Sequence, residues 1–204
     1  MNLGKKSAED SYKSISAPSK GLYKDKGSKF LSFAFPVESE DEAKVIISNL
    51  KKEYFDARHH CWAWRTGHLG DKWRFNDDGE PSSTAGKPIY GQILSNDLSD
   101  ILIVVVRYFG GTLLGTSGLI TAYKTAAAEA VANATIVEKV AAVRYSVSFD
   151  YSRMNDVMKC LKDMRLNVTD PQFSSQCTLT TSVRLSLEAY FLETMQKISI
   201  CQRV

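Results

Sequence analysis

The sequence predicts an α+β protein of two domains, residues 1–140 and residues 141–204. Two patterns carry this prediction. Strand-like runs and helix-like periodicities alternate along residues 29–134. A strand, helix, strand, strand, helix order then begins near residue 143 and fills the rest of the chain. A length of 204 residues is enough for two domains with a core each.

The first elements follow from local patterns. Residues 1–20 are rich in Lys and Ser, and we expect a loose lead-in or a first short element there. Residues 29–36 place aromatic side chains at alternating positions and end on a proline, which predicts a strand. Ser39 stands three residues before Glu42, a capping-box spacing, so we expect a helix from about residue 40 to 54.

The middle of the first domain combines a hairpin, a long loop and a buried strand. Residues 56–65 and 72–75 read as the hairpin. Residues 76–88 are dense in turn formers and predict a loop, and residues 90–94 could begin a short helix. The β-branched run at 101–106 predicts a strand that is buried on both faces. A helix is expected to start near residue 116 or 117 and to run to about 134, because apolar residues recur on one face. Its repeated alanines allow close packing on a sheet.

The second domain has the order of a ferredoxin-like unit. We expect strands over residues 145–149, 166–174 and 177–185, and helices over 154–164 and 187–198. The final strand of the usual split βαβ arrangement is missing from this pattern.

Composition excludes several classes of protein. The longest aliphatic run, Ile101–Val106, is far shorter than the ~20 residues that span a bilayer. The charged start lacks the apolar stretch of a signal peptide, so we expect a cytoplasmic protein without a membrane partner. The four cysteines have no metal-ligand spacing and predict free thiols. We therefore expect no metal and no cofactor.

The net charge of +3 conceals differences between regions. Residues 1–30 carry seven Lys and three acids, residues 31–140 carry 11 basic and 14 acidic residues, and residues 141–204 carry eight and six. If RNA is the partner, the first and last of these regions should supply most of the attraction.

The glycine turn Gly110–Ser117 is the first candidate site. It follows a strand and precedes a helix, as a phosphate-binding loop does, but Thr116 stands where that loop has its lysine. Nucleotide hydrolysis is therefore not expected. Backbone N–H groups at the helix start could still hold an anion. Alternatively, the glycines only form a tight turn and Thr116 or Ser117 is the N-cap.

Three further patterns are weaker. Asp77, Asp78 and Glu80 could bind a cation or move protons, or they could be turn acids and partners of Arg107 and Lys87. His59 and Cys61 share a strand face while His60 points away, so neither a nucleophilic dyad nor zinc is expected. Aromatic and basic residues mix as in binders of single-stranded nucleic acid, although core packing also explains the rings. These residues are Trp62, Trp64, Trp73, Phe75, Tyr90, Tyr108, Tyr123, Arg58, Arg65, Lys72, Arg74, Lys87 and Arg107.

The segments HHCWAWRTG, NDDGEPSSTAGKPIYGQI and DILIVVVRYFGGTLLGTSGLITAYKTAAAEA resemble the IMPACT/YigZ family over most of residues 20–135. The resemblance implies an N-terminal α/β domain similar to a small-subunit ribosomal protein and to domain IV of elongation factor G. It also implies a C-terminal ferredoxin-like domain similar to domain V of that factor. Eukaryotic members act in translational control, bacterial members are suspected of binding RNA or the translation machinery, and no catalytic residue is carried over.

The leading hypothesis is a non-enzymatic regulator or accessory factor of translation that binds RNA or a ribosome-associated protein. The alternative is an enzyme or a binder of small anions that uses the cleft between the DDGEPS loop and the RYFGG turn. The candidate binding residues are Asp77, Asp78, Glu80, Ser82, Thr84, Lys87, Arg107, Tyr108, Gly110, Gly111, Gly115, Thr116, Ser117 and Lys124.

Overall fold

The computed structural model of the protein describes residues 10–204 and is an α+β structure. The described residues divide into two compact units. The N-terminal unit runs from Tyr12 to Lys139, and the C-terminal unit from Val140 to Val204 together with Asp10 and Ser11. That residues 1–140 and 141–204 are separate domains, each able to fold independently, stays a prediction.

A five-stranded antiparallel sheet forms the centre of the N-terminal unit. The spatial order is β2, β3, β6, β4, β5. The predicted strand at 29–36, the hairpin and the strand at 101–106 are all present. The five strands are β2 (Ser19–Asp25), β3 (Ser28–Pro36), β4 (His59–Thr66), β5 (Lys72–Asn76) and β6 (Ile101–Tyr108).

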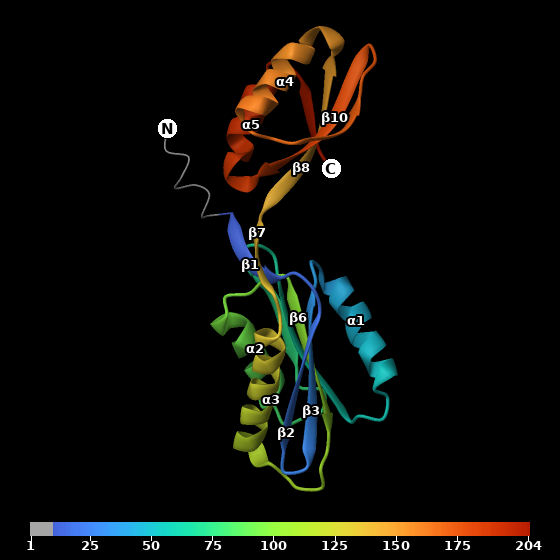
Figure 1. The fold of residues 1–204 in the computed structure, drawn as a ribbon, viewed down its shortest axis with the longest axis vertical. Helices are drawn as coiled ribbons and strands as arrows, with labels where there is room; N and C mark the ends of the chain where they lie inside the picture. Colours follow the sequence, from blue (N-terminus) through green and yellow to red (C-terminus); the bar gives the residue numbers. More distant parts are fainter. Residues whose placement is uncertain (1–9) are drawn as a thin grey trace. The chain divides into compact units, whose positions relative to one another are not determined.

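Three helices cover the two faces of this sheet (Figure 1). On one face, α1 (Glu40–Glu53) packs with alternate residues of β6 such as Leu102 and Val104. On the other face, α2 (Gly86–Ser95) and α3 (Gly115–Ala132) pack with the intervening residues, Ile103 and Val105. Strand β6 is therefore buried on both faces, as its continuous apolar run predicts.

The start of α2 and the N-cap of α3 differ from the prediction. At α1, the Ser39 hydroxyl accepts the Glu42 N–H at 3.2 Å, which confirms the cap. Helix α2 begins at Gly86, inside the predicted loop, and Pro88 is tolerated because it lies in the first turn. The start of α3 is within two residues of the one predicted near Thr116 or Ser117, but the predicted N-cap is wrong. The helix begins at Gly115 with Leu114 as its N-cap, and no side chain caps it.

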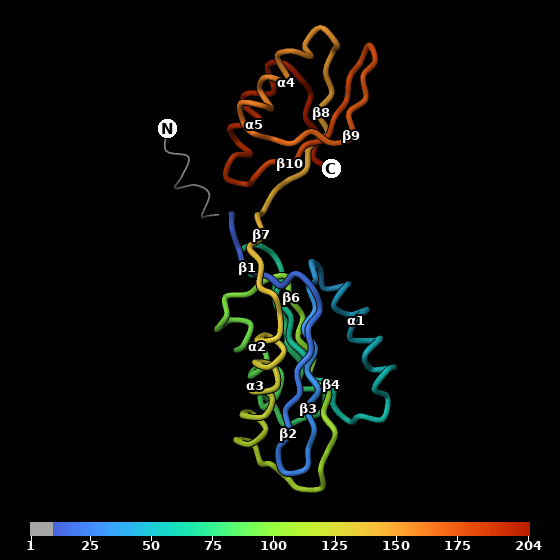
Figure 2. Tube along the Cα trace, viewed as in Figure 1, coloured from blue at the N-terminus to red at the C-terminus, as the bar shows by residue number. Residues whose placement is uncertain are grey.

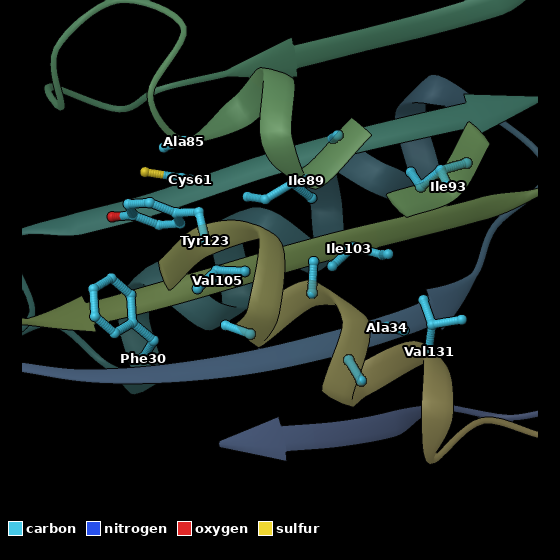
Figure 3. Close-up of a cluster of buried hydrophobic side chains, with 14 of the residues drawn as sticks. Phe30, Ala34, Cys61, Ala85, Ile89, Ile93, Ile103, Val105, Tyr123 and Val131 are labelled. Carbon is cyan, nitrogen blue, oxygen red and sulfur yellow. The ribbon is translucent and has the colours of Figure 1, made fainter. Parts of the chain in front are cut away.

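Small residues let α3 approach the sheet closely (Figure 3). Its inward alanines, Ala122, Ala126, Ala127 and Ala130, are fully buried. The ring of Tyr123 meets that of Phe30 edge-on, with centroids 5.2 Å apart. A side chain at Gly21 of β2 would place its Cβ 2.7 Å from the backbone nitrogen of Ala130. This packing requires glycine at that position.

The lead-in segment contains more regular structure than expected. Residues 1–9 of this segment lie outside the described residues. Strand β1 (Ser11–Ile15) pairs with β7 (Ile136–Val140) in a two-stranded sheet, and β2 already begins at Ser19. Of the two expectations for residues 1–20, the first short element is confirmed by β1, and the loose lead-in is wrong for residues 11–15 and 19–20.

The C-terminal unit has the complete ferredoxin-like order, and the chain trace in Figure 2 shows its helices α4 and α5 side by side. Its sheet runs β11, β8, β10, β9. The predicted absence of a last strand is wrong. Strand β11 has four residues, lies at the sheet edge and buries none of them fully, so it shows no alternation in the sequence. The elements are β8 (Ala142–Asp150), a 3-10 turn (Tyr151–Arg153), α4 (Met154–Asp163), β9 (Val168–Gln172), β10 (Gln176–Arg184), a second 3-10 turn (Leu185–Leu187), α5 (Glu188–Met195) and β11 (Ile200–Arg203).

Candidate functional site

Asp77 holds the loop before α2 in shape. One carboxylate oxygen accepts the N–H groups of Ala85 and Gly86 at 3.0 and 2.8 Å, and the other accepts that of Ser83 at 2.9 Å. Helix α2 has no cap from its own N-cap side chain, so Asp77 satisfies these donors from eight and nine positions earlier in the chain. The same contacts favour a negative charge at the helix N-terminus.

Asp78 ties the loop to the start of β4. Its carboxylate accepts from Lys51 Nζ and from the His60 backbone N–H, each at 2.7 Å. Its backbone carbonyl lies 2.9 Å from His59 Nδ1. The residue has a φ of +43°, a left-handed conformation that Asp tolerates better than most residues. Both oxygens of Asp78 are thus engaged within the protein.

Glu80 and Arg107 form a buried ion pair on the α2 and α3 face of the sheet. Arg107 Nη1 donates to Glu80 Oε1 at 2.5 Å, and the Tyr123 hydroxyl donates to the same oxygen at 2.8 Å. Burial, together with nearby Cys61 and Glu80, raises the pKa of Tyr123 and keeps its proton in place. The Arg107 guanidinium lies between the rings of Phe30 and Phe109, at 5.5 and 5.7 Å from their centroids.

A pocket of about 410 Å³ opens beside this ion pair. It brings together four of the predicted residues, Glu80, Arg107, Gly115 and Thr116. Gly115 has a φ of +72° and turns the chain into α3 at the pocket wall. The other residues that line the pocket are Arg58, His59, Pro81, Phe109, Leu113, Leu114 and Leu119.

Several predicted residues lie elsewhere. Tyr108 is on the opposite face of β6 and donates to Asp56 at 2.7 Å, which raises the pKa of Tyr108 to about 12. Lys87 and Lys124 are exposed and do not line the pocket. Ser82 is exposed in the loop, and Ser117 is exposed in the first turn of α3.

Three other predicted residues help to shape the loop and the turn. The buried Thr84 hydroxyl donates to the Pro81 carbonyl at 2.6 Å. Gly110 packs directly on the backbone of Gly27, where a Cβ would lie 1.9 Å from the Gly27 carbonyl carbon. Gly111 has a φ of +87° and makes the turn after β6.

The other chemical possibilities weighed from the sequence find little support. Cys61 is fully buried, and burial raises its pKa, so the thiol stays protonated at neutral pH. His59 and Cys61 share a face, and His60 contacts the Tyr54 carbonyl instead. Among residues 10–204, no three His, Cys, Asp or Glu side chains are placed to hold a metal ion. No helix within that range has the length and hydropathy of a membrane span.

The sheet separates the aromatic residues that the sequence grouped together. Trp73 stacks on Tyr90 and Phe75 at the β5 edge, with centroids 4.9 and 6.0 Å away. Trp62, Trp64 and Tyr108 belong to the α1 face, and Tyr123 is buried in the core. These rings cannot form one stacking surface.

A group of lysines that the sequence did not single out lies on the α1 face. Lys20, Lys24 and Lys29 project from β2 and β3 beside Leu22 and are exposed. In the register, Lys24 is directly opposite Lys29, and Lys29 is directly opposite Tyr108. We call Lys20, Leu22, Lys24 and Lys29 the lysine face. The signal that could have revealed it is the hairpin turn at residues 25–28, which sets the pairing.

Comparisons with known proteins agree with the fold. The sequence pattern of the Impact N-terminal domain matches residues 26–131. An IMPACT family member of Haemophilus influenzae is 32% identical over 177 residues, covering 85% of this chain and 86% of that protein. The IMPACT family member YigZ of Escherichia coli is 37% identical over 134 residues, covering 65% of this chain and 66% of that protein. The crystal structure of a hypothetical protein superposes with a TM-score of 0.71 at 27% identity, covering 96% and 98%.

Proposed function

This chain belongs to the IMPACT family, and from that premise we propose that it is a non-enzymatic regulator or accessory factor of translation that binds RNA through its lysine face. The family resemblance supports the link to translation. The observation that carries RNA binding is the Lys24 and Lys29 pair, two like charges placed opposite each other on neighbouring strands.

The pairing of Lys24 with Lys29 is unfavourable for the protein alone. Like charges directly opposite each other destabilise a sheet. Within the described residues, neither side chain makes an ion pair with an acid. A polyanion that bridges the two ammonium groups would remove the repulsion and release its own counterions.

The neighbouring apolar groups suit a base or a sugar. Lys20 Nζ lies 5.4 Å from the centroid of the Phe33 ring, and Leu22 is 47% exposed between two lysines of the same strand. Helix α1 packs against β4, on the far side of β6 from these strands (Figure 1). The β2 and β3 side of this face is therefore available to a strand of RNA, with phosphate contacts from the lysines and apolar contact from the exposed Leu22.

We further propose that the N-terminal unit shares the fold of a small-subunit ribosomal protein and of domain IV of elongation factor G, and that the C-terminal unit shares the fold of domain V of that factor. The β11, β8, β10, β9 order of the C-terminal sheet supports the second assignment. Superposition of each unit alone on these domains tests it.

The test is binding of a fluorescent single-stranded RNA, followed by anisotropy over a range of salt concentrations. We expect affinity to fall as salt rises, and the Lys24→Glu/Lys29→Glu variant to bind more weakly with a slope of log K against log salt reduced by about two. The Lys87→Glu/Lys124→Glu variant carries the same change in charge on other surfaces. A larger loss for that second variant, or no binding of RNA at low salt, would overturn the proposal. Ribosomal protein captured after nuclease treatment would indicate a protein partner instead.

A further inference from the structure

The pocket beside Arg107 is separate from the lysine face, because the two lie on opposite faces of the same sheet. We propose that this pocket binds a phosphate monoester that carries an apolar or aromatic body. The inference goes beyond RNA binding through the lysine face and depends on different residues.

The first argument is the incomplete bonding of Arg107. Its side chain is 6% exposed, and a guanidinium has five N–H donors. Within the described residues, the hydrogen bond from Nη1 to Glu80 is the one that the side chain makes, and Nε is buried without a partner. Buried polar groups almost always have partners. A phosphate in the pocket would supply acceptors for a guanidinium that already lines it.

The second argument is the start of α3 in the wall of the same pocket. Leu114, Gly115 and Thr116 all line it, and no side chain caps the helix. The first-turn N–H groups of an 18-residue helix therefore meet the pocket with the positive end of the helix dipole. Thr116, which also carries a hydroxyl group, is part of this wall. Arg107 and the helix start approach from different elements, so the two observations are independent.

The third argument is the charge of the lining. Arg58 and Arg107 provide two guanidinium groups against one carboxylate, that of Glu80. Glu80 Oε1 already accepts from Arg107 and Tyr123, and His59 Nε2 lies 3.9 Å away. The acid is thus neutralised inside the protein, and the mouth of the pocket favours an anion.

The fourth argument is that the apolar lining of the pocket favours a ligand with an apolar or aromatic group beside its phosphate. Phe109 and Leu113 line the pocket and are 47% and 83% exposed, although they are large and apolar. Pro81, Leu114 and Leu119 extend the apolar lining. Inorganic phosphate would leave these surfaces in water. A volume of about 410 Å³ suits a small organic ligand whose polar end is fixed by a few donors.

Phenyl phosphate is the probe, and chemical-shift changes in the amide NMR spectrum of the full chain are the measurement. We expect shifts confined to the pocket residues and binding about tenfold tighter than that of inorganic phosphate, with phenol weaker still. Thr116→Glu is the informative variant. A carboxylate at a helix N-terminus keeps the helix stable but repels a phosphate. We expect an unchanged or higher melting temperature and at least a tenfold loss of phenyl phosphate affinity.

Arg58→Ala removes an exposed cation and should weaken binding severalfold, while Lys24→Glu/Lys29→Glu should not change it. The proposal is overturned if phenyl phosphate gives no shifts at the pocket, if phenol binds equally well, or if Thr116→Glu binds normally. Two RNA oligonucleotides that differ only in a 5′-phosphate distinguish the source. Tighter binding of the phosphorylated strand assigns the pocket to an RNA end, and equal binding with retained phenyl phosphate affinity assigns it to a free metabolite.

Discussion

Two charged pairs on the same sheet contrast with each other. Glu80 and Arg107 are opposite charges, buried where α2 and α3 cover one face. Lys24 and Lys29 are like charges, exposed on the face that α1 covers in part. Burial permits only the paired arrangement, because an unpaired charge away from water is expensive. Exposure permits the repulsive arrangement, because solvent and salt screen it. The Glu80 and Arg107 pair therefore bears on the stability of the fold, and the Lys24 and Lys29 pair bears on the binding of a partner.

The largest expected effect is that of Glu80→Ala. This change leaves the Arg107 guanidinium buried without its counter-ion and removes the acceptor of the Tyr123 hydroxyl. Breaking a buried ion pair in this way destabilises proteins by about 3–5 kcal/mol. Urea unfolding followed by circular dichroism measures the free energy of unfolding.

The matched control removes both charges. Glu80→Ala/Arg107→Met leaves no buried charge, so we expect it to be more stable than Glu80→Ala by about 1–3 kcal/mol. If the double variant were instead the less stable of the two, the buried charge of Arg107 would not be the cause of the loss.

The next effect is that of Asp77→Ala on the same face. Three backbone N–H groups lose their carboxylate acceptor at the start of α2. Caps of this kind contribute about 1–2 kcal/mol, which is the destabilisation we expect in the same unfolding experiment. Asp77→Asn keeps one oxygen for Ala85 and Gly86 and should lose less than half as much. Equal losses for the two variants would contradict the capping role.

The sequence predicts an element best where a local pattern is sufficient. Strand β6 contains an uninterrupted apolar run, and Ser39 caps the Glu42 N–H at the start of α1, so both elements are predicted correctly. Strand β2 is hidden because one inward position is Gly21, where the backbone of α3 leaves no room for a side chain. Strand β11 is hidden because it has only four residues, lies at the sheet edge and buries none of them fully.

The roles of the candidate residues are also hidden from the sequence where they depend on contacts between distant positions. Asp77 and Glu80 stand three positions apart in one loop, yet the first caps α2 and the second reaches a strand 27 positions away. Nothing local distinguishes these roles, because they depend on which donors the fold brings to each carboxylate. The lysine face likewise needs the β2 and β3 register, which a one-residue shift would invert.

The smallest effect on stability has the greatest bearing on function. Lys24→Glu converts a repulsive cross-strand pair with Lys29 into an attractive one, so we expect the folded state to gain about 0.5 kcal/mol. Lys24→Gln, which removes only the repulsion, should give a smaller gain. Both variants should bind RNA more weakly, and Lys24→Glu the more so, because a phosphate contact is lost or opposed. A substitution that stabilises the fold while it weakens binding separates the two roles, since a residue selected for structure alone would not behave in this way. Loss of stability in Lys24→Glu would mean that the lysines do not repel each other across the strands.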